Sequence, residues 1–302
     1  MDAAAEHGGA DGDAAAAAAT VAAMGAYGGA VRAAESAAEE ILLLWALRQP
    51  TAHRHNAFVR HSAQTLTLDA CGRHLSILQS PSAMSAPGVT GAVMWDSGVV
   101  LGKFLEHAVD SGRLLLRGRR AVELGAGCGL VGCIAALLGA DVVLTDLPDR
   151  LKLLKKNVEL NVEGHSRGSA TVSELTWGDD PDPELMEPPP EFVLGSDVIY
   201  SEEAVEDLLT TLKQLSGTHT TIFLAGELRN EKKIHLIDVV LECFLDAAME
   251  DFLVGCIDQT EWHPDYRSNR VALFVLVLKN REKQIELPFG GSAQKRTSVQ
   301  VS

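Results

Sequence analysis

A short stretch at residues 122–129, with the sequence VELGAGCG, is the part of the chain best suited to bind a charged ligand. The pattern predicts a strand that runs into glycines and then a helix, an arrangement in which the backbone can approach a ligand closely. Asp146 lies 21 residues after Gly125, at the end of the next predicted strand. A carboxylate there can accept both hydroxyls of a ribose. The spacing therefore predicts a nucleoside-containing cofactor across two neighbouring strands.

The glycine pattern leaves two cofactor classes open. Gly127-x-Gly129-x-x-Gly132 also matches the dinucleotide fingerprint, which would indicate a nicotinamide cofactor. The strand ends at Leu124, however, so a turn that starts at Gly127 comes two residues late. Glu123 adds a carboxylate that would repel a pyrophosphate but favour the cationic methionine part of S-adenosylmethionine. The residues favour S-adenosylmethionine, and a tight turn without a ligand is the remaining alternative.

Alternating strands and helices must position these residues. The periodicity predicts two closing strands with no helix between them, so one strand of an otherwise parallel sheet should be antiparallel. Two alternating runs around Gly72 predict a β-hairpin before this region, and a helix precedes the hairpin. The expected strands are 64–69, 74–78, 121–124, 141–145, 170–175, 191–194, 220–225, 252–257 and 271–279, and the expected helices are 35–47, 130–138, 149–161, 202–215 and 232–245.

Composition and charge narrow the class of protein. The 302 residues include 41 acidic and 26 basic side chains, a net charge of −15, which argues against binding to nucleic acid or an anionic membrane. We find no apolar run of about 18 residues that would predict a membrane span. The five cysteines form no Cys-x-x-Cys pair and no metal-ligand spacing with histidines. We therefore expect no metal, and a cytoplasmic or also nuclear location in a reducing compartment.

The composition also suggests three regions. Residues 1–40 contain 18 alanines and seven acids, with Arg32 as their single base, which argues against a targeting peptide. We expect residues 1–35 to be a disordered alanine-rich tail and residues 36–280 to be one folded domain that includes the N-terminal helix and the hairpin. Residues 281–302 are expected to be a polar tail.

Four stretches, in order, resemble the motifs of methyltransferase family 16, which belongs to the seven-β-strand methyltransferases. The glycine turn resembles their motif I, and GAVMWDSG at 91–98 is similar to their Val-Trp-Asp segment. ELTWG at 174–178 follows the third strand, and GSDVIY at 195–200 carries an Asp-x-x-Tyr after the fourth. The resemblance covers about residues 64–280.

Within this family, the chain resembles the methyltransferase-21-like protein-lysine methyltransferases, whose members act on chaperone-type ATPases and translation factors. Two stretches, 200–203 and 265–268, are similar to the valosin-containing-protein lysine methyltransferases. The resemblance implies an α/β, Rossmann-like, seven-stranded S-adenosylmethionine-dependent methyltransferase fold with an N-terminal β-hairpin extension. It also implies a chain that binds S-adenosyl-L-methionine and acts on a protein substrate presenting a lysine. We further expect a monomer, with no nucleic acid and no membrane as partner.

The resemblance assigns roles to individual residues. Those expected at the cofactor are Trp95, Glu123, Gly125, Ala126, Gly127, Asp146, Trp177 and Ser196. Asp146 would hold the ribose and Trp177 would present its ring to the adenine. Trp45 and Trp262 lie outside these motifs and are expected to pack in the core. Asp96 is expected to serve mainly as a helix N-cap.

Asp197 and Tyr200 are the expected catalytic pair. Asp197 would hold the amine of a substrate lysine by a hydrogen bond, and Tyr200 would form a wall of the lysine channel. The alternative is that Asp197 caps the next helix and Tyr200 packs. Adenine methylases of nucleic acids have two prolines at this point, where this chain has Val198 and Ile199, so a nucleic-acid substrate is disfavoured.

Two further features have open interpretations. Glu227 and Arg229 resemble an acid-x-Arg pair of the family, and either order the substrate side or form a surface pair. The loop at 178–191 contains six acids and five prolines, which is typical of a solvated loop. An acidic rim that attracts a basic substrate surface is the alternative.

The sequence supports one main function and three alternatives. The main prediction is a protein-lysine N-methyltransferase that acts on a folded protein. The alternatives are a methyltransferase of a small-molecule amine, a nicotinamide-dependent oxidoreductase, and a non-catalytic binding module that keeps the fold.

Overall fold

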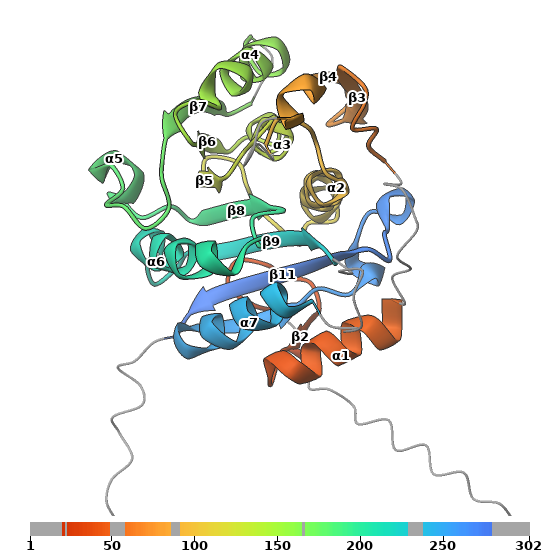
Figure 1. Ribbon diagram of the computed structural model, residues 1–302, viewed down its shortest axis with the longest axis vertical. Coiled ribbons are helices and arrows are strands. Elements are labelled where there is room, and N and C mark those ends of the chain that lie inside the picture. Colours follow the sequence, from red (N-terminus) through yellow and green to blue (C-terminus); the bar gives the residue numbers. More distant parts are fainter. Residues whose placement is uncertain are drawn as a thin grey trace, which may run out of the picture.

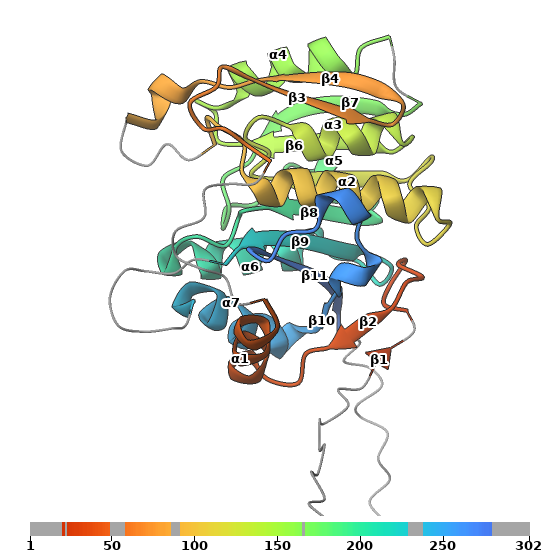
Figure 2. The ribbon, with the colours of Figure 1, turned by 90° about the vertical axis from the view of Figure 1, so that its right-hand side faces the viewer.

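A central mixed sheet organises the computed structural model, which describes residues 20–21, 23–48, 58–85, 91–164, 167–228 and 238–279. Within these residues the sheet has nine strands in the order β1-β2-β10-β11-β9-β8-β5-β6-β7 (Figures 1 and 2). Five neighbouring strands run parallel to one another: β5 Arg120–Leu124, β6 Asp141–Asp146, β7 Ser169–Glu174, β8 Phe192–Ser196 and β9 Thr221–Glu227.

The two closing strands complete a seven-stranded unit. β10 Phe252–Cys256 and β11 Val271–Leu278 pair with each other, and β11 also pairs antiparallel with β9. The single antiparallel strand expected in this part of the sheet is therefore confirmed. β11 is an almost continuous apolar run (VALFVLVL), as expected for a strand that is covered on both faces.

Helices cover both faces of the sheet, as Figures 1 and 2 show from two directions. Side chains from α2, α3 and α4 pack into one apolar core, and side chains from α1, α6 and α7 pack into a second core on the opposite face. Their bounds are α1 Ala37–Arg48, α2 Asp96–Asp110, α3 Leu130–Leu137, α4 Leu151–Asn161, α6 Val205–Leu215 and α7 Val239–Asp251. Short helical turns lie at Pro81–Ser85, α5 Pro183–Met186, Glu202–Ala204, Gln259–Glu261 and Pro264–Tyr266.

The expected hairpin is also present. β3 Thr65–Ala70 and β4 Arg73–Leu78 form a separate two-stranded sheet that lies against α4 (Figure 2). Two asparagines of α4 continue the hydrogen bonding of β4. Asn161 bonds both the N–H and the C=O of Ser76, and Asn157 does the same with Leu78. The free edge of β4 is thereby satisfied by side-chain amides instead of a third strand.

Residues near the N-terminus belong to the fold, so the prediction of a disordered tail over residues 1–35 is wrong for its second half. β1 Thr20–Val21 pairs with β2 Val31–Ala33, and β2 pairs antiparallel with β10. These two short strands extend the seven-stranded unit at its β10 edge. Residues 1–19 lie outside the described residues.

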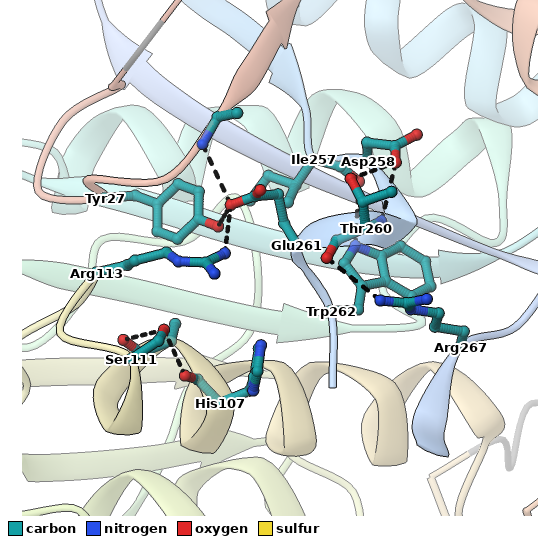
Figure 3. A network of polar contacts seen from close by, with 12 residues as sticks. Tyr27, His107, Ser111, Arg113, Ile257, Asp258, Thr260, Glu261, Trp262 and Arg267 are labelled. Carbon is teal, nitrogen blue, oxygen red and sulfur yellow. Dashed lines mark hydrogen bonds and ion pairs between the residues drawn. The ribbon is translucent and has the colours of Figure 1, made fainter. Parts of the chain in front are cut away.

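Tyr27, between β1 and β2, anchors this N-terminal segment. Its side chain is fully buried, and its ring packs 5.4 Å from Phe104 of α2 and 6.0 Å from Phe223 of β9. Its hydroxyl donates a hydrogen bond of 3.1 Å to Glu261, which also accepts one of 2.6 Å from Arg113 (Figure 3). Burial, together with the charge of Glu261, raises the pKa of Tyr27 well above its ordinary value. The segment is therefore held by both apolar packing and a charged network.

Other boundaries differ modestly from expectation. α7 begins at Val239, and residues 232–237 of the predicted helix lie outside the described residues. The predicted helix over 202–215 divides into a short 3-10 turn and α6. Arg229 and the predicted tail 281–302 lie outside the described residues. None of the helices within the described ranges is long and apolar enough to cross a membrane.

Candidate active site

A cavity of about 230 Å³ lies where the strands β5, β6, β7 and β8 end. In open α/β sheets, ligands bind at this end of the strands, beside the point where the strand order reverses. Here that point lies between β5 and β8, because β6 continues on one side of β5 and β9 on the other side of β8. The predicted residues that line the cavity are Trp95, Gly125, Ala126, Gly127, Asp146, Trp177, Ser196, Asp197 and Tyr200.

The glycine turn after β5 forms one wall of the cavity. Gly125 and Gly127 have φ angles of +57° and +54°, a left-handed conformation that glycine adopts without strain. A Cβ atom at Gly127 would lie 3.1 Å from the carbonyl oxygen of Gly91, and one at Gly125 would lie 3.0 Å from the Trp177 ring. A side chain at either position would therefore require these neighbours to shift.

Asp146 at the end of β6 faces the glycine turn. Its Oδ2 accepts a 2.7 Å hydrogen bond from the N–H of Gly127, and its Oδ1 accepts one of 2.8 Å from the N–H of Leu147. Burial raises the pKa of this carboxyl above its ordinary value, and the two backbone N–H groups oppose that shift. Asp146 is therefore held rigidly at the cavity wall, with oxygen lone pairs left to accept bonds from a ligand's hydroxyls.

Glu123 was expected at the cofactor, and the structure corrects this prediction. Its side chain is only 1% exposed and does not line the cavity, because it points into the packing between β5 and α3. There its Oε2 accepts a 2.8 Å hydrogen bond from the N–H of Gly132, while Oε1 has no hydrogen-bond partner among the described residues. Burial raises the pKa of Glu123 to about 8. Its role is to fix α3 under the glycine turn.

The same contact explains why residue 132 is a glycine. The third glycine of the dinucleotide fingerprint serves close helix–strand packing, and Gly132 has this role here. In the structure Gly132 lies inside α3, against Glu123 and Leu144, where an added Cβ would come within 2.5 Å of both side chains. The close packing of α3 on the Glu123 carboxyl group therefore explains the need for glycine at position 132.

Two tryptophans line the cavity, as expected from their motifs. The Trp177 ring, just after β7, lies 6.2 Å from the Tyr200 ring. Trp95, directly before α2, has its ring 4.5 Å from that of His61. The two tryptophans outside the motifs pack elsewhere. Trp262 is buried and donates to the carbonyl of Ile257, and Trp45 is partly buried in the second core.

Asp197 has an unusual backbone conformation. Its φ is +57°, its N–H donates a 2.7 Å hydrogen bond to the carbonyl of Ala225, and its Oδ1 accepts one of 3.3 Å from the N–H of Glu227. The following turn and α6 have Ser201 and Ala204 as their N-cap residues, so Asp197 is not a helix cap. A left-handed conformation outside glycine is uncommon and concentrates at functional sites. Tyr200 is 37% exposed at the cavity, which argues against a purely packing role.

Glu227 and Asp96 differ from their expected roles. Glu227 is only 8% exposed, so it is no surface pair, and its Oε2 lies 3.8 Å from the guanidinium of Arg270. Asp96 is the first residue of α2 instead of its N-cap, and its Oδ1 accepts hydrogen bonds from the N–H groups of Phe58 and Val59. Both acids are thus buried beside the cavity.

Sequence reasoning missed several residues of the cavity. The cavity is also lined by Arg150 at the start of α4, by Asp207 of α6 and by Met94, which precedes Trp95. Their signal was weak, since only their place shortly after a strand end or within a motif suggests them. The acidic loop 178–191 also has more structure than a solvated loop, because it contains α5 with Leu185 buried.

Comparison with known proteins decides the family. A family model described as lysine methyltransferase matches residues 75–242, which is more than half of the chain. The chain belongs to the lysine methyltransferase family. This match confirms the resemblance to methyltransferase family 16 that the four motifs indicate.

Two relatives of this lysine methyltransferase chain come from Mus musculus. Protein N-lysine methyltransferase METTL21A is 46% identical over 151 residues, which are 49% of this chain and 66% of that protein. EEF1A lysine methyltransferase 3 is 41% identical over 161 residues, which are 53% of this chain and 65% of that protein. The chain thus matches slightly less than two thirds of the length of either relative. Among solved structures, a glycopeptide N-methyltransferase MtfA complexed with sinefungin has a TM-score of 0.45 and 13% identity, covering 60% of this chain and 94% of that one.

Proposed function

We propose that this chain transfers a methyl group from S-adenosyl-L-methionine to a lysine of a folded protein. The observation that carries the proposal is that Asp197 and the glycine turn share one cavity. A cofactor seated on that turn and an amine held by Asp197 would then meet inside the same cavity. The family match supports a lysine as the acceptor.

The residues of the cavity fit this cofactor. Asp146 would accept hydrogen bonds from the ribose hydroxyls, and Gly125 and Gly127 leave the space that the nucleoside needs. The Trp177 ring can lie against the adenine. When bound, S-adenosyl-L-methionine supplies a methyl group on a positively charged sulfur, and the other steps depend on how the chain presents the lysine.

Lysine must lose a proton before its nitrogen can attack. With a pKa near 10.4, only roughly one free amine in a thousand is neutral near pH 7.4. Loss of water contact in the cavity and a nearby positive charge both lower a lysine's pKa. Asp197 can then accept a hydrogen bond from the neutral amine and direct its lone pair, while the displaced proton leaves to solvent. Because the reaction is an in-line displacement, alignment should contribute more than acid–base catalysis.

Calorimetry with S-adenosylhomocysteine tests the cofactor assignment. We expect the wild-type chain to bind S-adenosylhomocysteine and not NAD, and Asp146→Ala to lose that binding. Asp149→Ala is the matched control, because Asp149 lies three residues away and its side chain is 66% exposed. Binding of NAD instead would support the oxidoreductase alternative and contradict the proposal.

Labelling of a cell extract tests the acceptor. The chain is incubated with S-adenosyl-L-methionine that carries a labelled methyl group, and we expect label in one or a few protein bands. The label should disappear with Asp197→Ala and remain with Glu206→Ala, which removes an exposed acid of α6. Label in small molecules alone would favour the small-amine alternative, and cofactor binding without any transfer would favour the binding module.

The finer assignments are part of the same proposal. We propose a chaperone-type ATPase or a translation factor as the class of substrate, and the protein acceptors named for both relatives are in line with this. All five cysteines are free, which supports a cytoplasmic or nuclear location. We propose that the chain works there as a monomer.

A further inference from the structure

Glu227 links two parts of the cavity that are far apart in the sequence. Its side-chain Oε1 accepts a 2.9 Å hydrogen bond from the N–H of Asp96, the first residue of α2. Its own N–H donates to the Oδ1 of Asp197. Trp95, directly before Asp96, and Asp197 both line the cavity, whereas Glu227 does not. Glu227, buried at the end of β9, therefore bonds both Asp96, the neighbour of Trp95, and Asp197.

The bond to Asp96 is the one that the side chain controls. Trp95 precedes α2 in an extended conformation, with φ −113° and ψ 154°, and α2 begins with no side-chain N-cap bond. The carboxylate of Glu227 thus supplies an acceptor to the first turn of α2 and a negative charge near its N-terminus, both of which stabilise a helix start. A weaker hydrogen bond between Glu227 and the Asp96 N–H should therefore leave Trp95, the preceding residue, less firmly positioned.

We propose that Glu227 is a positioning residue whose ionised carboxylate holds the start of α2, and with it Trp95, in the geometry that binds the cofactor. The inference rests on the proposed function, because it concerns the same cavity. Glu227, the acid of the acid-x-Arg pair, would thus act on the cofactor side of the cavity by holding the start of α2.

The charges around Glu227 bring its ionisation into the neutral range. Burial, the charge of Asp197 and the charge of Asp96 raise the pKa of Glu227 to about 7, while the Asp96 N–H and Arg270 oppose this shift. These groups come from the segments packed against it, after β8, at the start of α2 and before β11. A charge-assisted hydrogen bond is roughly twice as strong as a neutral one. Protonation should therefore loosen the contact with α2 as the pH falls below about 7.

Binding of S-adenosylhomocysteine at several pH values tests the proposal without a protein substrate. We expect the affinity of the wild-type chain to fall about fivefold between pH 8 and pH 6, the loss expected when a charged hydrogen bond becomes neutral. Glu227→Gln keeps an acceptor oxygen without the charge. Its affinity should be independent of pH and equal to that of the wild type at pH 6. Glu227→Asp keeps the charge on a shorter side chain, and should be weak at pH 8 as well.

Two control variants separate this effect from other titrations. Glu206→Gln removes an exposed acid and should keep the wild-type pH dependence. His61→Gln should keep it too, although the His61 ring contacts Trp95. Loss of the pH dependence in His61→Gln would reassign it to that histidine and overturn the proposal. Thermal unfolding confirms that each variant is folded.

The outcomes distinguish this inference from the proposed function. If the wild type binds no S-adenosylhomocysteine at any pH, the proposed function itself fails. If it binds with the same affinity at pH 6 and pH 8, only the role of Glu227 is overturned. A wild-type pH dependence that persists in Glu227→Gln likewise overturns the role of Glu227 and leaves the proposed function intact.

Discussion

Glu123 lies near the end of β5, where a carboxyl group suggests ligand binding, but its buried side chain bonds α3 instead. Its pKa is raised to about 8 because burial disfavours the charged form. The group is therefore mostly protonated at neutral pH, which avoids an uncompensated charge beneath the glycine turn. The stability of the protein must then depend on the proton that Glu123 holds.

This dependence gives a prediction with a definite sign. The folded-state pKa of about 8 exceeds the ordinary value of 4.5, so between these pH values the folded state binds more protons than the unfolded state. The free energy of unfolding should fall as the pH rises from 5 to 8, by up to about 1.4 kcal/mol per pH unit and proton. Urea denaturation at half-unit pH steps measures this slope. Glu123→Gln should make the fall of unfolding free energy with pH less steep, by the amount that corresponds to about one proton. An unchanged slope would contradict the pKa assigned to Glu123.

Asp197 gives a second prediction at the same scale. Asparagine tolerates the left-handed conformation, so Asp197→Asn should keep the backbone but lose the charge that faces the lysine. We expect S-adenosylhomocysteine to bind within about twofold of wild type, and methyl transfer to fall by about 100-fold or more, because the amine is misaligned. Parallel calorimetry and transfer assays on the labelled protein band measure both. Equal losses in binding and transfer would instead indicate a structural role.

At the scale of elements, the two asparagines of α4 connect the hairpin to the site. Asn157 is fully buried, and its amide donates to the carbonyl oxygens of both Leu78 and Cys128. Cys128 belongs to the turn that lines the cavity. Asn161 bonds Ser76 of the hairpin and the carbonyl of Asn157, but not the turn. The pair therefore offers a matched comparison.

Replacing each asparagine by alanine should separate hairpin docking from cofactor binding. Asn157→Ala leaves several buried backbone groups unpaired, and we expect a loss of about 3 kcal/mol in unfolding free energy. Hydrogen exchange at the Leu78 amide should accelerate, and affinity for S-adenosylhomocysteine should fall. Asn161→Ala should accelerate exchange at Ser76 with little change in that affinity. Similar effects of the two variants on affinity would show that the Cys128 contact is not important.

The sequence predicted those elements that depend on local patterns. Alternating residues identify the hairpin and β7, and short apolar runs identify β5, β6 and β8. The strand-glycine-helix order places the cavity at the correct end of the sheet. Glu123 was misassigned because a strand end does not reveal on which face of the strand a side chain lies. Glu227 was not recognised as buried, since the groups that cover it, among them Asp96, come from distant segments.

At the scale of the whole molecule, the N-terminal segment shows where composition misleads. Its many alanines resemble a disordered tail, yet Tyr27 and Val31 are completely buried. Their burial depends on Phe104, Phe223 and β10, which lie far along the chain. Local sequence carries no record of such partners, so no periodicity could have predicted this packing.

Two variants of Tyr27 measure how strongly this segment is held. Tyr27→Ala removes a fully buried aromatic ring, which should cost about 3–5 kcal/mol of unfolding free energy. Tyr27→Phe keeps the ring and removes only the hydrogen bond to Glu261, so a cost of about 1 kcal/mol is expected, because Arg113 still pairs with Glu261. Thermal or urea unfolding gives both values. If Tyr27→Ala is as stable as Tyr27→Phe, the segment contributes little to the fold.

The attachment of Tyr27 also sets an order of events during protein synthesis. Tyr27 leaves the ribosome 234 residues before Glu261, its hydrogen-bond partner. At ordinary rates of translation this interval lasts on the order of tens of seconds. The parallel strands β5 and β6 are complete long before then, whereas β2 must wait for β10. The segment around Tyr27 is consequently made well before its partners, and it can dock at the sheet edge only after β10 and Glu261 have been synthesised.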